Sequence, residues 1–196
     1  FKQCYLNFLL KQNLLREQTF DYDQLVVAND HVVYNNIVAR HVIFAEGFGL
    51  QHNPFFYYLS LDGTKGELLL IHAPQLELDS IINSSIFILP IGNDLYKIGA
   101  TYNWEDKSEI PTENGKQELL EKLKNTINCD FEVREHVAGV RPTVKDRRPL
   151  VGTHHKFINI HILNGLGTRG VMLGPTLAKK IFDSIELKTP IESKIN

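Results

Sequence analysis

Two neighbouring stretches decide how this chain folds: GVRPTVKDRRPLVG at residues 139–152 and NGLGTRGVMLGP at residues 164–175. The segment FINIHIL at residues 157–163 lies between them, alternates in character and is rich in β-branched side chains, which predicts a strand. From Val171 to about Leu187 the apolar residues recur at helical spacing, which predicts a helix. The predicted order is therefore a strand, a glycine loop and a helix.

The glycine loop has the pattern G-x-G-x-x-G, with Gly165, Gly167 and Gly170. Glycines let the backbone turn sharply and approach a ligand closely. The free N–H groups and the positive end of the following helix favour an anion, or a ring that carries negative charge. We reject a dinucleotide fingerprint here, because that motif needs a second strand with an acidic residue roughly 20 positions later. A flexible turn that closes a helix N-terminus is the alternative.

The first stretch carries a positive cluster among its prolines. A guanidinium can hold a carboxylate with two parallel hydrogen bonds, so Arg141 is a candidate ligand residue. From the residues alone, a structural salt bridge to Asp146 or Glu135 is the favoured alternative for it. Prolines on both sides predict a rigid loop, so we expect Asp146, Arg147 and Arg148 to be structural.

Upstream, the sequence predicts an amphipathic helix over residues 1–16 and short strands over residues 18–28 and 30–35. Residues 37–44 predict one strongly apolar strand, and a tight glycine loop follows at residues 46–49. Alpha/beta proteins place ligands just past the C-terminal end of a buried strand, although an ordinary turn would have the same sequence.

From residue 51 onward the pattern predicts two hairpins. One joins residues 55–61 to residues 66–73 through Asp62-Gly63, and the other joins residues 85–91 to residues 95–102 through a turn at residues 92–94. Tyr102 and Trp104 share one face of the strand end and could wall a pocket, although half-buried aromatic residues are common on sheets. Lys65 follows the first turn, as a solvated hairpin lysine or as a cofactor contact.

A helix is expected after Thr112, which is a plausible N-cap, and a strand over residues 131–140. Strands, one helix and a further strand make an α+β subdomain with a largely antiparallel sheet. We expect it to be inserted into a layer that both ends of the chain form together.

Taken in order, G-x-R-P, D-x-x-P, an apolar-Gly pair, a strand, G-x-G-x-x-G and a helix resemble the C-terminal end of the D-amino-acid-oxidase-like family of FAD-dependent oxidoreductases. That family includes glycine and sarcosine oxidases and amino-acid dehydrogenases. Three upstream segments also resemble the family: ARHVIFAEG at residues 39–47 its strand beside the cofactor, TKGELL at residues 64–69 its K-G-E/Q turn, and IGATYNW at residues 98–104 its substrate-domain strand. The resemblance covers most of the chain from about residue 37.

The resemblance implies an α+β / α/β fold, in which an antiparallel-sheet substrate domain is inserted into the remaining part of a Rossmann-like FAD-binding domain. The expected bounds are 1–50 for part of the FAD-binding domain, 51–137 for the substrate domain and 138–196 for the C-terminal part of the FAD-binding domain. The implied activity is oxidation of the C–N bond of an amino acid or related amine, by hydride transfer to FAD. Because no N-terminal glycine motif precedes Phe1, we expect the C-terminal portion of a longer protein, inactive alone.

The resemblance also assigns roles to residues. Arg141 would grip the substrate carboxylate and Tyr102 would wall the substrate site, which makes these two the catalytic candidates. The expected cofactor-binding residues are Gly47, Lys65, Gly165, Gly167, Thr168, Arg169 and Gly170.

Two other functions stay open. The chain could be a non-catalytic carboxylate-binding or protein-interaction module derived from this family. The G-L-G-x-R-G loop also resembles the flavin domain of a tRNA-modifying enzyme of the same family, although the missing basic excess argues against RNA.

Composition bounds the partners. A net charge of −2 gives no reason to expect nucleic acid or an anionic membrane as partner, and no run approaches the roughly 18 apolar residues of a membrane span. Cys4 and Cys129 have no C-x-x-C spacing, which fits a reducing cytoplasm. The eight histidines form no ligand pattern, so no metal is expected. A small amine or amino acid is the expected partner, and the sequence leaves the oligomeric state open.

Overall fold

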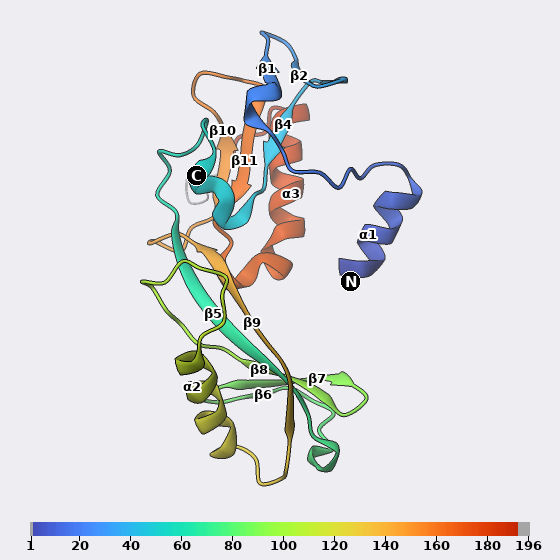
Figure 1. Cartoon of the computed structure of the whole chain (residues 1–196). Coiled ribbons are helices and arrows are strands. Elements are labelled where there is room, and N and C mark those ends of the chain that lie inside the picture. The colour runs from blue at the N-terminus through green and yellow to red at the C-terminus, as the bar shows by residue number, and fades with distance from the viewer. Residues whose placement is uncertain (1, 192–196) are drawn as a thin grey trace.

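Two long strands form the spine of the computed structural model, which describes residues 2–191. Strand β5 (Asp62–His72) pairs antiparallel with β9 (Glu132–Thr143) along its whole length, from Asp62 opposite Thr143 to His72 opposite Glu132. Figure 1 shows this pair running from the upper part of the molecule into the lower part. The pair therefore carries Lys65, Gly66 and Arg141 in one rigid ribbon.

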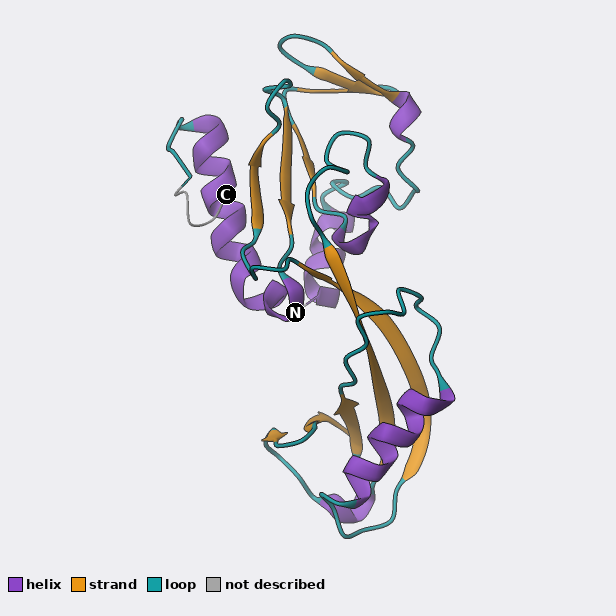
Figure 2. Ribbon diagram, turned by 90° about the vertical axis from the view of Figure 1, so that its left-hand side faces the viewer, coloured by secondary structure: helices purple, strands orange, loops and turns teal. Residues whose placement is uncertain are grey.

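The lower part is one antiparallel sheet covered by a helix. Its strands lie in the order β6 (Ile82–Asn83), β7 (Phe87–Gly92), β8 (Leu95–Gly99), β5 and β9. Helix α2 (Glu113–Lys124) lies along one face (Figure 2). It forms there because Thr112 caps it, its hydroxyl accepting from the amide of Gly115 at 3.1 Å, and because Leu119 and Leu123 give it an apolar face.

The upper part holds a second sheet and the C-terminal helix. Strand β11 (Ile160–Asn164) lies between β10 (Leu150–Thr153), antiparallel to it, and β4 (Val42–Phe44), parallel to it. Helix α3 (Gly170–Glu186) buries Leu177, Ile181 and Ile185 against Val151 of that sheet. The turn that leaves β11 therefore leads directly into the first turn of α3.

Smaller elements complete the fold. A three-stranded antiparallel sheet consists of β1 (Leu25–Val27), β2 (Val32–Tyr34) and β3 (Ile37–Ala39). Helix α1 (Lys2–Lys11) stands apart from both larger sheets in Figure 1. The predicted fold class, a mixed α and β chain with a largely antiparallel sheet, is confirmed.

Local turn and cap signals predicted several elements correctly. The turn after residue 92 is present, with Asn93 at φ 53° and Asp94 at φ 55°, the pair of positive φ angles that a type I′ hairpin needs. The cap at Thr112, the strand before the glycine loop and the helix after it also match the structure, although β11 begins only at Ile160.

The predicted turn at Asp62-Gly63 is wrong, because both residues lie inside β5. A Cβ atom at Gly63 would overlap Phe48 and Val140, so this glycine is needed for close packing and not for turning. Residues 55–61 form turns instead of a strand.

Three predictions near the N-terminus are also wrong in extent. Residues 37–44 form two strands, because β3 pairs with β2 while β4 pairs with β11. The strand predicted over residues 18–28 shrinks to β1, after a 3-10 turn that the Asp21 side chain caps. The first helix ends at Lys11, before Asn13 at φ 55°.

Candidate active site

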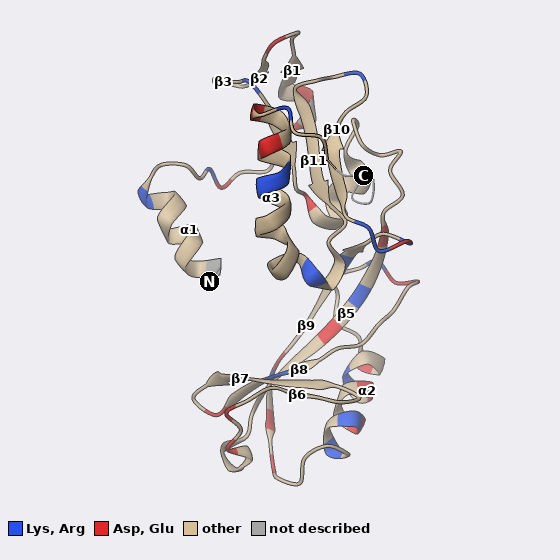
Figure 3. Cartoon of the chain, turned by 180° about the vertical axis from the view of Figure 1, so that it is seen from behind, with Lys and Arg blue, Asp and Glu red and all other residues tan. Residues whose placement is uncertain are grey.

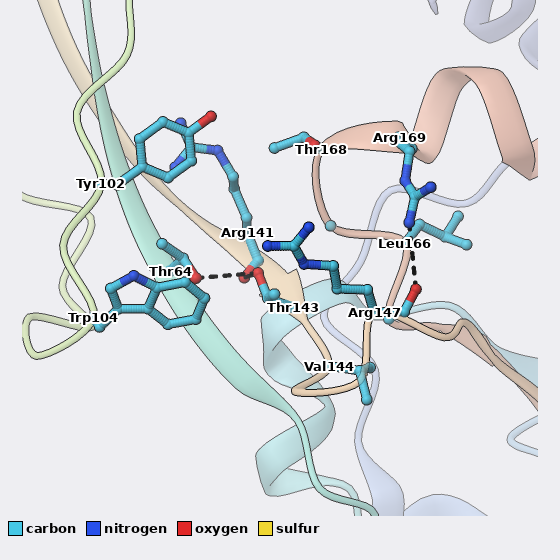
Figure 4. Close-up of a pocket in the computed structure, with 12 residues that line it drawn as sticks. Thr64, Tyr102, Trp104, Arg141, Thr143, Val144, Arg147, Leu166, Thr168 and Arg169 are labelled. Atoms are coloured by element: carbon cyan, nitrogen blue, oxygen red, sulfur yellow. Dashed lines mark hydrogen bonds between the residues drawn. The ribbon is translucent and has the colours of Figure 1, made fainter.

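A cavity of about 480 Å³ lies where β5, β9, the loop after β8 and the loop before α3 meet (Figure 4). Six residues that the sequence singled out as site candidates line it: Tyr102, Arg141, Gly165, Gly167, Thr168 and Arg169. Six further residues line it with them: Thr64, Trp104, Thr143, Val144, Arg147 and Leu166. The structure therefore brings together segments that are up to about a hundred residues apart in the sequence.

Arg141 points into this cavity from β9. Its guanidinium carbon lies 4.5 Å from the centre of the Tyr102 ring, and its Nη1 donates to the Thr101 carbonyl at 3.4 Å. Within residues 2–191 no carboxylate lies within ion-pair distance of this guanidinium, so the alternative of a structural salt bridge to Asp146 or Glu135 is wrong. Most of its five N–H donors remain available to an anion.

The position of the Arg141 side chain depends on a glycine in the neighbouring strand. Arg141 pairs with Thr64, and Gly66 lies two residues further along β5 on the same face. A Cβ atom at Gly66 would overlap the guanidinium, whereas a Cβ atom at the opposing Gly139 would meet nothing within 4 Å. Gly66 is therefore the residue that admits the side chain of Arg141.

The loop before α3 is open on the side that faces the cavity. Gly165 and Gly167 have φ angles of 70° and 55°, and Gly165 also has no room for a Cβ atom because Val144 and Leu150 pack against it. At Gly167 a Cβ atom would meet nothing within 4 Å. No side chain caps the first turn of α3, which begins at Gly170 directly after the 3-10 turn Gly167–Arg169. The positive end of this helix therefore faces the cavity without a side chain over it.

This loop fits the edge of a flavin ring. An uncapped helix N-terminus supplies N–H donors and a positive dipole end, and Gly167 leaves space beside them for a flat ring. Thr168 and Arg169 lie in the same short 3-10 turn, Gly167–Arg169, and add polar side chains at its rim. The residues present are therefore compatible with the cofactor that the sequence predicts.

Arg147 corrects one expectation, because it lines the cavity instead of serving only the loop. Its backbone has a φ angle of 61°, and its carbonyl accepts from Nη2 of Arg169 at 3.3 Å. Asp146 and Arg148 behave as expected of a structural loop: the Arg148 amide donates to Asp146 at 3.0 Å, and their side chains pair at 3.6 Å. The positive φ of Arg147, a non-glycine residue, had no signal in the sequence.

Gly47 does not line the cavity, but a hydrogen-bonded link ties it to the glycine loop. Asn164, at the end of β11, donates to the Gly47 carbonyl at 2.9 Å and accepts from the Gly165 amide at 2.7 Å. Sequence reasoning missed Asn164, although an asparagine directly before a glycine was a signal for such a turn. Gly47 itself has a φ angle of 60°, which glycine adopts without strain because it has no Cβ atom.

Lys65 is fully buried, so the first of its two alternatives, a solvated hairpin lysine, is wrong. Its Nζ donates to Asp106 at 2.5 Å, to Ser108 at 3.2 Å and to the Ile110 carbonyl. These contacts tie β5 to the loop that also carries Trp104. Lys65 does not line the cavity, and its contact with a cofactor stays a prediction.

Glu67 extends this buried polar network. It accepts from the amide and hydroxyl of Thr112 at 2.9 Å and 2.8 Å, and its Oε2 lies 2.8 Å from Nε2 of His136. Burial raises the pKa of Glu67, but the bonds from Thr112 and the charge of Lys65 outweigh it and leave that pKa below its usual value. The ammonium of Lys65 lowers the pKa of Asp106 to about 2. Both carboxylates are therefore charged at neutral pH.

Two further properties follow from the part of the chain that the structure describes. Within residues 2–191 no three His, Cys, Asp or Glu side chains gather as metal ligands would. No helix in the same range is long and apolar enough to cross a membrane.

The chain is similar to a known family along most of its length. Residues 18–184 match the family model DAO, described as FAD dependent oxidoreductase. The glycine oxidase of Bacillus subtilis is 28% identical over 157 residues, which cover 76% of this chain and 42% of that protein. The bifunctional protein MnmC of Marinobacter nauticus, named for tRNA 5-methylaminomethyl-2-thiouridine biosynthesis, is 25% identical over 187 residues, which cover 85% of this chain and 30% of that protein.

A solved structure shows the same fold. The glycine oxidase of Bacillus cereus aligns with a TM-score of 0.69 and 21% identity, over 85% of this chain and 49% of that one. The chain thus spans less than half the length of these relatives.

Proposed function

This chain belongs to the DAO family of FAD-dependent oxidoreductases, and from that premise we propose that the protein oxidises the C–N bond of an amino acid or related amine. The observation that carries the proposal is the guanidinium of Arg141, which lies over Tyr102 in the cavity with no carboxylate paired to it in residues 2–191. Such a group binds a substrate carboxylate through two parallel hydrogen bonds.

In this proposal the residues of the cavity divide the work. Arg141 holds the carboxylate and so orients the carbon that bears the amine. The ring of Tyr102 packs against the guanidinium and holds it in place. Gly165, Gly167 and the first turn of α3 hold the flavin edge, with Thr168, Arg169 and Gly170 beside it and Gly47 tied to the loop by Asn164. FAD, when bound, supplies the two-electron acceptor. The positive end of α3, which no side chain caps, stabilises negative charge at the ring edge.

The proposal concerns the whole protein, of which this chain matches only a part in its relatives. We propose that residues 51–137 form the substrate domain and that residues 1–50 and 138–196 belong to the FAD-binding domain. The five-stranded sheet and α2 support that division. All of their elements lie within residues 51–137 except β9, which extends to Thr143. Two free cysteines support a reducing cytoplasm as its location.

The test is a visible absorption spectrum of the purified protein, before and after a panel of amino acids is added. We expect flavin bands near roughly 370 and 450 nm that bleach with one amino acid under anaerobic conditions. In Arg141→Met the bands should remain, while the substrate concentration for half-maximal bleaching rises about ten- to a hundredfold, because a charge-assisted bond to a carboxylate is lost.

The matched control is Arg148→Met, an arginine seven residues away that pairs with Asp146 and does not line the cavity. It should leave both the bands and the bleaching unchanged. A protein that shows no flavin bands even with added FAD would refute the oxidoreductase, and would leave a carboxylate-binding module as the function.

A second candidate function has one observation in its favour, the similarity to MnmC over 85% of this chain. In that case the amine would be part of a modified tRNA. The net charge of −2 gives the chain no general attraction to RNA. Bleaching by a tRNA that carries the amine, with none by free amino acids, would favour this candidate over the first.

A further inference from the structure

The cavity of the candidate active site carries more positive charge than one amino acid can balance. Among the residues that the structure describes, three arginines line it, Arg141, Arg147 and Arg169, and no aspartate or glutamate does. Figure 3 shows the basic residues of the loop between β9 and β10 close to the start of α3. Arg147 and Arg169 are exposed at the rim of this cavity, so water and salt weaken their mutual repulsion, and an anion held between the guanidiniums would remove the rest.

Within residues 2–191, the guanidinium of Arg147 has fewer protein partners than that of Arg141 or Arg169. Its backbone is fixed, since its amide donates to the Val144 carbonyl at 2.8 Å and its own carbonyl accepts from Arg169 at 3.3 Å. Its guanidinium has no acceptor within residues 2–191, because the nearby Asp146 is paired with Arg148. Figure 4 shows the side chain extending from the loop toward the side of the cavity that holds Arg141 and Thr143.

These contacts indicate how many negative charges a ligand in the cavity would carry. An amino acid brings one carboxylate, which Arg141 binds under the function proposed above, and an amine that adds no negative charge. Arg169 donates one hydrogen bond to the carbonyl of Arg147, whereas the guanidinium of Arg147 donates none within residues 2–191.

We infer that the substrate is an amine with two carboxylates, the first held by Arg141 and the second by Arg147. This inference rests on the proposed function, because it adds a second anion site to the same cavity. In this inference Arg147 determines which substrate binds. Arg141 still orients the carbon that is oxidised.

The test uses two unreactive probes, propionate and succinate, which differ by one carboxylate. Their dissociation constants are measured on the FAD-loaded protein by calorimetry, with the fluorescence of Trp104, the only tryptophan of the chain and a residue of the cavity wall, as a second signal. We expect succinate to bind about tenfold or more tightly than propionate. Arg147→Gln should abolish that preference and leave propionate binding unchanged, and Arg148→Gln should alter neither value.

Equal affinities for the two probes in the unmodified protein would overturn the inference. So would an Arg147→Gln variant that keeps the preference for succinate but binds FAD more weakly, because Arg147 would then serve the flavin. The proposed function fails separately: a succinate preference that depends on Arg147, in a protein whose flavin no amine bleaches, would keep the dicarboxylate site and remove the oxidase. Bleaching by monocarboxylic amines with no succinate preference would keep the oxidase and reject the dicarboxylate site.

Discussion

Gly66 leaves the space on β5 that the Arg141 guanidinium occupies. We predict that Gly66→Ala forces the guanidinium off the face of β5, because the new methyl group would overlap it. Such overpacking costs about 1–3 kcal/mol, so we expect the dissociation constant of a carboxylate ligand to rise by about five- to a hundredfold. Calorimetry with propionate measures it.

The control for this change lies directly across the ribbon. Gly139 pairs with Gly66 and has open space where a Cβ atom would lie, so Gly139→Ala should leave propionate binding unchanged. Equal effects of the two substitutions would show that the strand, and not the room for Arg141, sets the affinity.

His161 has the largest lowering of pKa among the histidines at the upper sheet, where burial also lowers the pKa of His41 and of His154. It is buried on β11, with Nε2 at 3.0 Å from Nδ1 of His41 and Nδ1 at 2.8 Å from the Thr153 hydroxyl. Burial, with help from His41 and Lys188, lowers its pKa from 6.5 to about 4. Between these values the unfolded chain binds a proton that the folded chain does not, so stability is complete above pH 6.5 and falls as the pH drops toward about 4.

We therefore predict that the urea midpoint falls between pH 7 and pH 4.5, and that the fall is smaller in His161→Gln. Glutamine removes the titrating group, so the comparison concerns the change with pH and not the absolute midpoint. His52→Gln, at an exposed position, is the control and should show the full decrease. A His161→Gln variant with an undiminished decrease would assign the acid sensitivity to other groups.

At the scale of elements, β5 is held to the loop over residues 103–112 by the buried ammonium of Lys65. We predict that Lys65→Met destabilises the fold by about 3–5 kcal/mol, because the carboxylate of Glu67 would remain buried without the cation. Equilibrium unfolding in urea measures the change. Because the same loop carries Trp104, the fluorescence of this tryptophan should change as well.

Lys122→Met gives the matched comparison. Lys122 pairs with Glu118 at 2.6 Å on the outer face of α2, where such a pair contributes about 0.3–0.5 kcal/mol. A loss of comparable size in the two variants would mean that the network at Lys65 adds nothing beyond a surface pair.

For the molecule over residues 2–191, stability resides in three cores, and α1 belongs to none of them. The cores lie under α2, around Phe44 and Ile160, and between α3 and β10. We predict that Leu10→Ala on α1 lowers the melting temperature by less than about 2 °C, since Leu10 is 48% exposed, whereas Leu119→Ala on α2 costs about 2–5 kcal/mol, or at least about 4 °C. Calorimetric scans of both variants measure this difference. Similar losses would place α1 against the body of the protein.

The sequence by itself determined the features that depend on near neighbours. Asn93 and Asp94 predicted the hairpin that they turn, and Thr112 predicted the helix that it caps. The glycine loop, its flanking strand and helix, and Arg141 were also recognised from the sequence. Each of these signals acts within a few residues, because turn angles, caps and helical spacing are local properties. The order of these motifs was sufficient to identify the family.

Only the tertiary structure decided what depends on distant partners. Arg147 faces the cavity because Arg169, 22 residues away, holds its carbonyl, and Gly47 joins the glycine loop through Asn164, 117 residues away. Lys65 is buried because Asp106, 41 residues away, receives its ammonium. The pairing of β5 with β9 placed Gly63 inside a strand, where its local turn signal had no effect. Contacts of this kind leave no pattern in neighbouring residues, since the side chains that fix them meet only after the chain has folded.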